Sequence, residues 1–143
     1  MRPMKLGSLF LGLVLLAGCG RDSAKLKVGV ILPMSGDTST FGEESWNGIQ
    51  LAYEDLKKEG VSWDLVLKDE KSSKTEASNQ AKLLIDSERV DVLLGSVASS
   101  NTMQIAVEAR ESGVPLITPA STNDKVTVDG GPYVSRIWFK DSF

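Results

Sequence analysis

The side chains that could do chemistry in this chain are hydroxyls and carboxylates rather than imidazoles or thiols. The 143 residues include no histidine and one cysteine. A Ser-His-Asp or Cys-His catalytic group is therefore impossible within the chain, and a single cysteine forms neither an internal disulfide nor a structural zinc site. Carboxylate-based or lysine-based chemistry stays open. The formal net charge of -3 gives no general attraction for nucleic acid, so we expect no nucleic-acid partner, no metal and no other cofactor.

Three segments rich in glycine and hydroxyl side chains each follow an apolar run, at residues 33–42, 95–102 and 117–124. The glycines of the first segment fit neither the Walker spacing nor the G-x-G-x-x-G pattern, so a nucleotide site is poorly supported. The second segment opens a helical stretch, whose free N–H groups and positive dipole end favour an anion such as a carboxylate. Ser99 and Ser100 could add hydroxyl donors there. Serine at a helix start is equally typical of N-capping alone.

The elements that must position these segments alternate between strand-like and helix-like patterns. Apolar β-branched runs predict strands, and apolar residues at helical spacing predict helices. In chain order, the expected elements are strand 26–32, helix 41–58, strand 63–68, helix 74–87, strand 90–94, helix 101–110, strand 114–118 and a fifth strand within 133–137. This alternation predicts an α/β fold, a three-layer α-β-α arrangement around a parallel sheet with right-handed crossovers. Ligands of such sheets bind beyond the carboxyl ends of the strands, where all three segments lie, although the third would also suit an ordinary turn.

The start of the chain has the pattern of a bacterial export signal. After a positively charged start, residues 6–16 form an apolar run that is shorter than the ~20 residues of a membrane-spanning helix. Leu-Ala-Gly-Cys at residues 16–19 resembles a lipobox, in which the cysteine becomes the lipidated first residue of the mature protein. We interpret residues 1–18 as a lipoprotein signal peptide and residues 19–25 as the lipidated Cys19 with its tether; a plain secretory signal is the alternative. The protein would then be exported and lipid-anchored to the cell envelope, on the periplasmic face in a Gram-negative host.

The part after this signal resembles the type I periplasmic (solute-) binding proteins, in particular the branched-chain amino acid or leucine-binding protein family of ABC importers. The order and spacing of five segments carry the similarity, at residues 27–36, 41–42, 46–49, 95–102 and 114–122. The resemblance implies a substrate-binding component that binds a small amino acid-like ligand without any reaction or cofactor. It also implies a membrane-embedded ABC permease as the partner.

The same resemblance implies roles for particular residues. In that family, the first lobe holds most of the ligand's α-carboxylate and α-ammonium groups. By position, Ser99 corresponds to the serine that binds the carboxylate, with Ser100 beside it as a further hydroxyl. Ala120 and Thr122 correspond to residues that offer a backbone carbonyl and a hydroxyl, and Phe41 corresponds to an aromatic residue that covers the ligand.

The family closes two lobes over its ligand, whereas this chain resembles only the opening part of the first lobe. Residues 26–138 correspond to a partial N-terminal ligand-binding lobe, and residues 139–143 to a truncated crossover towards a missing second lobe. We therefore interpret the chain as the binding protein of an importer or as its truncated remnant. We also expect its sheet to expose a strand edge and an apolar face.

Two alternative functions stay open from the sequence. A sensory or regulatory ligand-binding lipoprotein would use the same fold and the same three segments. An exported α/β enzyme belongs to another class of protein, and the absent histidine and absent nucleotide patterns argue against it.

Overall fold

The computed structural model of the protein describes residues 25–142. The predicted signal peptide 1–18, Cys19 and the tether up to residue 24 lie outside the described residues, so their interpretation stays a prediction. Within residues 25–142, no helix is both long enough and apolar enough to cross a membrane.

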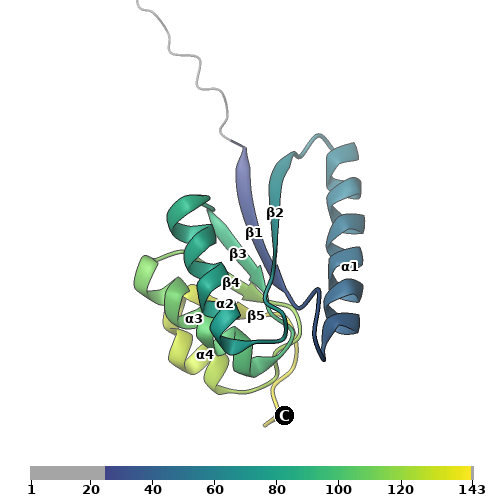
Figure 1. The fold of residues 1–143 in the computed structure, drawn as a ribbon. Coiled ribbons are helices and arrows are strands. Elements are labelled where there is room, and N and C mark those ends of the chain that lie inside the picture. Colours follow the sequence, from purple (N-terminus) through teal and green to yellow (C-terminus); the bar gives the residue numbers. More distant parts are fainter. Residues whose placement is uncertain (1–24, 143) are drawn as a thin grey trace, which may run out of the picture.

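Five parallel strands form one sheet in the order β2-β1-β3-β4-β5 (Figure 1). The predicted α/β fold class with a parallel sheet is therefore confirmed. β3 and β4 each begin two residues later than predicted. Before β3, the Asp91 carboxylate accepts the Lys27 N–H at 2.8 Å in place of a backbone carbonyl. Before β4, Pro115 has no N–H to donate to the ladder. The strands are β1 (Leu26–Leu32), β2 (Trp63–Asp69), β3 (Val92–Gly95), β4 (Leu116–Thr118) and β5 (Val134–Arg136).

Three predicted helices are present, and one short helix was missed. Gly113, with φ of 73°, ends α3 in the left-handed conformation that suits glycine. The missed helix is rich in β-branched residues, which are weak helix formers, and it forms because its Val126 is buried against α3 and the sheet. The helices are α1 (Ser39–Lys58), α2 (Lys74–Lys82) with its wider last turn Leu83–Ser87, α3 (Ser99–Ser112), and the missed α4 (Lys125–Gly130) with the short 3-10 turn Gly131–Tyr133.

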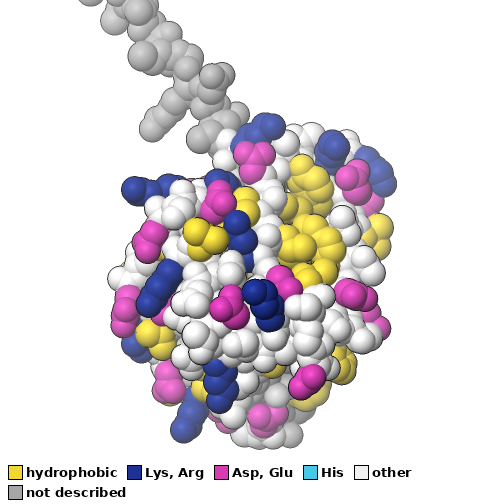
Figure 2. Space-filling model, in the orientation of Figure 1, with side chains coloured by type: hydrophobic (Ala, Val, Ile, Leu, Met, Phe, Trp, Pro, Cys, Tyr) yellow, Lys and Arg dark blue, Asp and Glu magenta, His cyan; other side chains and the backbone are white. Residues whose placement is uncertain are grey.

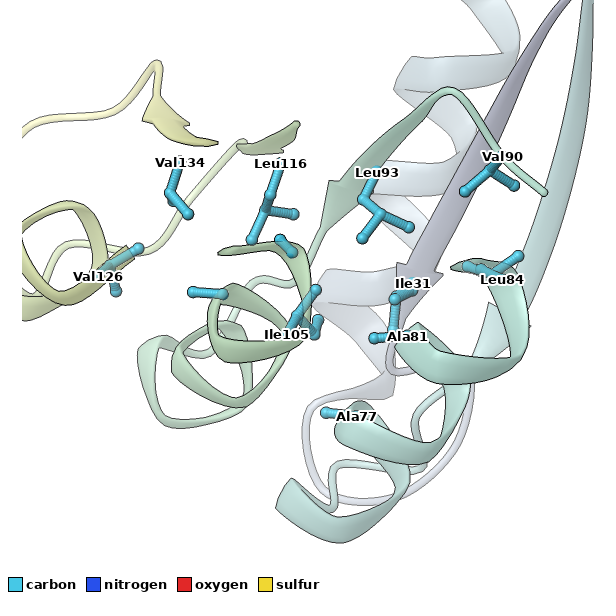
Figure 3. Packing of buried hydrophobic residues seen from close by; sticks show 12 residues of the cluster. Ile31, Ala77, Ala81, Leu84, Val90, Leu93, Ile105, Leu116, Val126 and Val134 are labelled. Carbon is cyan, nitrogen blue, oxygen red and sulfur yellow. The ribbon is translucent and has the colours of Figure 1, made fainter. Parts of the chain in front are cut away.

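The helices are divided unevenly between the two faces of the sheet (Figure 1). α2, α3 and α4 pack on one face, where the largest hydrophobic core forms between them and the strands (Figure 3). This side gives the fold most of its buried apolar area, the main source of folding free energy. The core consists of Ile31, Ala77, Ala81, Leu84, Val90, Leu93, Ile105, Ala106, Ala109, Leu116, Val126 and Val134.

Among residues 25–142, α1 is the one helix that covers the other face (Figure 1). Val28, Val30 and Leu32 are fully buried on this side, whereas Trp46 and Ile49 of α1 stay half-buried. Hydrophobic side chains reach the surface beside α1 (Figure 2). The described part of the chain therefore has the exposed apolar face that the sequence predicted. Its clearest feature is an apolar hollow of about 400 Å³ lined by Leu26, Val28, Trp63, Val92, Leu94 and Ile117.

Candidate ligand-binding site

The three hydroxyl-rich segments meet where the strands end, at the lower end of the sheet in Figure 1. A cavity of about 280 Å³ lies between them, and all three segments line it. Its volume is close to the lower end of the ~300–1,000 Å³ typical of small-molecule pockets. The structure thus brings together the predicted residues Phe41 and Ala120, in a wall completed by Thr38, Val97 and Ala98.

Ser99 joins the second and third segments. It is the first residue of α3 and follows Ala98 of the cavity wall. Its hydroxyl oxygen accepts the N–H of Asn123 at 3.2 Å. A serine hydroxyl that accepts one bond keeps its own proton for donation, and among the described residues no acceptor takes it. Ser99 therefore lies beside Asn123, the residue after Thr122. Its hydroxyl proton is available to an acceptor outside the described residues.

The start of α3 offers backbone donors as well. The N–H groups of Asn101 and Thr102 bond to the Ala98 carbonyl at 3.0 and 2.9 Å. Among the described residues, the N–H groups of Ser99 and Ser100 have no such backbone partner. At the positive end of a 14-residue helix, free N–H groups next to a serine hydroxyl suit a carboxylate.

Ser100 and Thr122 are placed differently from one another. The Ser100 hydroxyl donates to the side-chain oxygen of Asn101 at 3.2 Å, so it is turned towards its own helix. The Thr122 carbonyl accepts bonds from the Arg136 guanidinium at 3.1 Å and from the Asp141 N–H at 2.9 Å. Among the described residues, the Thr122 hydroxyl and the Ala120 carbonyl form no hydrogen bond. The ligand-binding roles of Ser99, Ser100, Ala120, Thr122 and Phe41 stay predictions.

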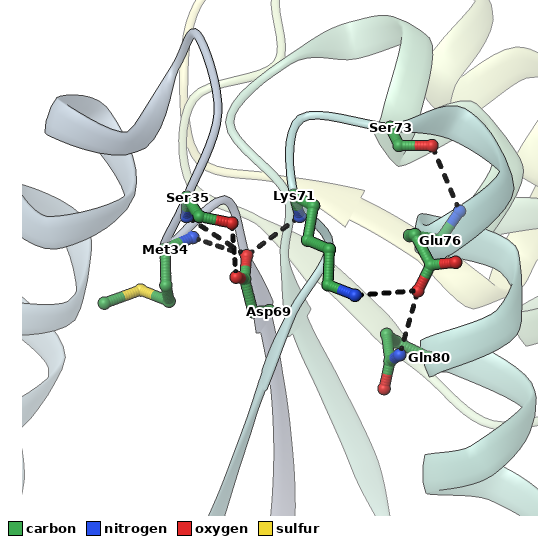
Figure 4. Close-up of polar contacts among 7 residues, drawn as sticks. All are labelled: Met34, Ser35, Asp69, Lys71, Ser73, Glu76 and Gln80. Atoms are coloured by element: carbon green, nitrogen blue, oxygen red, sulfur yellow. Dashed lines mark hydrogen bonds and ion pairs between the residues drawn. The ribbon is translucent and has the colours of Figure 1, made fainter.

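Asp69, at the end of β2, holds the first segment in place (Figure 4). One carboxylate oxygen accepts the N–H groups of Met34, Ser35 and Lys71 at 2.9, 3.2 and 2.8 Å, and the other accepts the Ser35 hydroxyl at 2.7 Å. Burial by itself would raise the pKa of Asp69, but the hydrogen bonds from Ser35, Lys71 and Met34 outweigh it and hold the pKa below its ordinary value. An ionised carboxylate thus fixes the path of the chain towards Phe41.

Two glycines allow backbones to approach closely at this edge of the sheet. A Cβ atom on Gly42 would collide with the carbonyl of Pro33, which keeps the start of α1 and its Phe41 against the end of β1. Gly95 has φ of 132°, and a Cβ atom there would collide with the Ile31 carbonyl. Any other residue at either position would therefore move the cavity wall.

Arg136, at the end of β5, was missed as a site residue from the sequence. Its guanidinium donates to three consecutive carbonyls, those of Ser121, Thr122 and Asn123, at 3.3, 3.1 and 2.9 Å. A second nitrogen bonds to the Thr127 hydroxyl at 3.3 Å. Arg136 thereby fixes the backbone of the third segment. A single arginine in a short strand carries no pattern that would have revealed this role.

Glu70 was also missed, and it is the one charged side chain among the fully buried polar residues of the described chain. Its carboxylate accepts a hydrogen bond from the Ser96 hydroxyl at 2.8 Å and another from the Asn101 amide. Burial raises the pKa of Glu70 above its ordinary value; bonds from Ser96, Asn101 and Ser73 oppose the rise, and the charge of Asp69 adds to it. Its place next to Asp69, in a segment that looks like a solvated loop, gave no signal of burial.

The described residues contain no cluster of side chains suited to bind a metal ion. Among residues 25–142, no three or more histidine, cysteine, aspartate or glutamate side chains are grouped so as to hold a metal ion. The cavity wall is mostly apolar, from Phe41, Val97, Ala98 and Ala120, with the Thr38 hydroxyl as its polar side chain; such a lining suits non-covalent binding of a small ligand.

Comparison with known proteins gives consistent matches. The profile of the family described as periplasmic binding protein matches residues 25–138. An amino acid binding protein of Pseudomonas aeruginosa is 32% identical over 122 residues, which are 82% of this chain and 33% of that protein. The crystal structure of a leucine-binding protein from Thermotoga maritima matches with a TM-score of 0.75 and 47% identity, over 81% of this chain and 33% of that chain. A solute-binding protein of an ABC transporter from R. palustris, in complex with benzoate, matches with a TM-score of 0.75 and 35% identity over the same shares.

These three relatives are all named as binding proteins, which agrees with the expectation of a binding protein rather than an enzyme. The chain spans about a third of the length of these relatives. The predicted resemblance to the N-terminal portion of type I periplasmic binding proteins is confirmed. By its profile match, its sequence identity and its fold, the chain belongs to the periplasmic binding protein family.

Proposed function

We propose that this chain carries part of the ligand-binding lobe of the substrate-binding component of an ABC importer, and that its ligand is a small carboxylate such as a branched-chain amino acid. The observation that carries the proposal is the cavity between the three segments, with Phe41 and Ala120 in its wall and Ser99 beside it. Binding is non-covalent, and no step of bond making or breaking is involved.

The carboxylate of the ligand rests at the start of α3. The Ser99 hydroxyl and the N–H groups of Ser99 and Ser100 are its donors, and the helix dipole adds to the attraction. Hydrogen bonds to a charged group are worth about 1.5–3 kcal/mol each, so loss of the Ser99 hydroxyl should weaken binding by roughly tenfold or more. The Ala120 carbonyl and the Thr122 hydroxyl then face an ammonium group.

The apolar part of the ligand packs on Phe41. The Phe41 side chain is 63% exposed, an unusual position for a large aromatic that a bound hydrocarbon group would cover. Leucine and benzoate both pair a carboxylate with an apolar body, and relatives of this chain are named as binding leucine or as complexed with benzoate. The carboxylate is the feature that we propose as common to the ligands.

We further propose that the protein is exported and lipid-anchored through Cys19, and that it delivers its ligand to a membrane permease. Leu26 begins β1 at the opposite end of the sheet from the cavity (Figure 1), so a tether at this end leaves the cavity directed away from the membrane. Labelling of growing cells with radioactive palmitate tests the anchor. Cys19→Ser should abolish the label, and a label that persists in this variant would contradict it.

Calorimetric or NMR titration of the chain with leucine, valine and benzoate tests the binding proposal. We expect weak binding by residues 25–142, with Kd on the order of 1 mM, because the described residues enclose the ligand from one side only. Ser99→Ala should weaken it by tenfold or more, and Ser112→Ala, at the exposed far end of the same helix, should not. A folded chain that binds none of the three ligands, or that binds equally well without the Ser99 hydroxyl, would contradict the proposal.

A further inference from the structure

The buried polar side chains of residues 25–142 form a single hydrogen-bonded network. Each of the six is at most 3% exposed, and they come from three different parts of the sequence, around residue 70, in 96–102 and in 118–121. All lie at the carboxyl end of the sheet, in or next to the segments that line the cavity. A core that is otherwise apolar thus concentrates its polar groups beside the candidate site. The six residues are Glu70, Ser96, Asn101, Thr102, Thr118 and Ser121.

Glu70 holds both ends of the loop that presents Ser99. Oε1 of its carboxylate accepts the Ser96 hydroxyl at 2.8 Å, and Oε2 accepts the side-chain N–H of Asn101. Ser96 and Asn101 bracket Val97 and Ala98, which line the cavity, together with Ser99 and Ser100, whose donors the proposed function assigns to the ligand. Because both bonds end on one rigid carboxylate, the distance between the two ends of the loop is fixed.

Hydroxyl groups then tie this loop to the third segment. The Thr102 hydroxyl oxygen accepts the Ser96 N–H at 3.0 Å and lies 2.7 Å from the Ser121 hydroxyl oxygen. The Thr118 hydroxyl donates to the Ser96 carbonyl at 2.9 Å. The network therefore connects the loop of Ser99 with the loop of Ala120 through buried bonds rather than through solvent.

A buried carboxylate is a costly way to gain stability. Taking a charge out of water carries a penalty that its hydrogen bonds only partly return, and burial correspondingly raises the pKa of Glu70. Well-packed apolar side chains in place of Glu70 and both of its donors would fill the same space at lower cost. What the carboxylate adds is a defined geometry, since its two oxygens are fixed relative to one another and each accepts one of the two loop donors.

We propose that Glu70 is the positioning residue of the ligand site, whose carboxylate sets where the Ser99 hydroxyl and the first N–H groups of α3 lie. This inference rests on the proposed function for the statement that the positioned groups bind a ligand. The arrangement of the loop is a property of the ligand-free chain and can be measured without any ligand.

A donor–acceptor exchange between Glu70 and Asn101 tests the proposal. Asn101→Asp places a second carboxylate against that of Glu70 and removes the amide donor. Adding Glu70→Gln restores a complementary pair, because the glutamine amide donates to Asp at position 101 while its oxygen accepts the Ser96 hydroxyl. Val90→Ala, which makes a cavity at the amino end of the sheet, is the control for general destabilisation.

The primary measurement is amide hydrogen exchange of the full chain without ligand. Asn101→Asp should speed exchange across residues 96–102 by at least about tenfold relative to the distant core, and the double variant should recover most of the protection. Val90→Ala should raise exchange without favouring this loop. If Asn101→Asp does not fold, a folded and protected double variant supports the proposal. Unchanged loop exchange in Asn101→Asp, or a double variant no better than the single one, overturns it.

Titration with leucine and benzoate separates this inference from the proposed function. If the parent chain binds either ligand, Asn101→Asp should weaken binding at least about tenfold and the double variant should restore it. If exchange follows the expected pattern but the parent chain binds neither ligand, the positioning role stands and the proposed function fails. If the parent binds and all variants bind equally, the positioning role fails and the proposed function stands.

Discussion

Replacing Asp69 with alanine removes the carboxylate that holds the first segment of the site, and it should cost about 1.5–3 kcal/mol of unfolding free energy. The carboxylate accepts four hydrogen bonds, and each bond to a charged group is worth about 1.5–3 kcal/mol. Their simple sum overstates the loss, because Ser35 and Lys71 are exposed and their donors can bond to water instead. Only the Met34 N–H is partly shielded, so the expected cost is that of about one such bond.

The stability that the Asp69 carboxylate contributes should depend on pH in a defined direction. The pKa of Asp69 in the folded chain lies below its ordinary value, which is about 3.9 in an unfolded chain. A carboxyl group with a lowered folded pKa contributes stability that is fully present above the unfolded value and is lost as pH falls through the folded value. The difference between the parent chain and Asp69→Ala should therefore be largest at neutral pH and shrink towards pH ~2.

Urea denaturation followed by circular dichroism at several pH values measures this difference. At neutral pH the midpoint of Asp69→Ala should fall by about 1 M urea, given slopes of about 1–3 kcal/mol per M for small proteins. Asp64→Ala is the matched control, since Asp64 is on the same strand and is exposed, and its carboxylate forms no hydrogen bond among the described residues. Equal midpoints for Asp69→Ala and the parent at neutral pH, or a difference that persists unchanged in acid, would refute the reasoning.

Three further predictions concern other parts of the chain. Arg136→Ala should speed amide exchange in residues 121–123, and Arg136→Lys should rescue it only in part because an ammonium lacks the guanidinium fork; equal exchange in all three proteins would contradict this. Glu88→Gln should lower the melting temperature at neutral pH but not near pH ~3. The ammonium groups of Lys27 and Lys68, at 3.0 and 3.2 Å, lower the pKa of Glu88, and the stability that they give is lost when the carboxylate is protonated. Melting curves at two salt concentrations check this, since added salt should shrink the difference. The open apolar hollow should make the chain self-associate, and Ile117→Thr in its wall should reduce that association in sedimentation velocity; a monomeric parent chain, or association unchanged by the substitution, would count against that hollow as a contact surface.

Periodicity predicted most of the elements because their patterns are local. β1 has the predicted bounds, and α1, α2 with its last turn, and α3 lie within two residues of the predicted helices. α4 was missed because its β-branched residues have weak intrinsic helix propensity and only burial of Val126 makes it favourable. Local patterns report local preferences, and this helix exists through a tertiary contact.

The sequence by itself determined that three hydroxyl-rich segments meet at one edge of the molecule. Strands that alternate with helices run parallel, and parallel strands all end on the same side. The same pattern was sufficient for the family resemblance and for the exclusion of catalytic histidine chemistry.

Only the tertiary structure decided which polar side chains are buried and what they hold. Glu70 bonds to residues 26 and 31 positions away, and Arg136 to carbonyls 13 to 15 positions away. The identity of these partners depends on how the loops cross at the sheet edge, which no local period encodes. In the described part of the chain, the coverage of the second face by α1 alone is likewise a result of packing, because it depends on which elements share that face rather than on the pattern within any one of them.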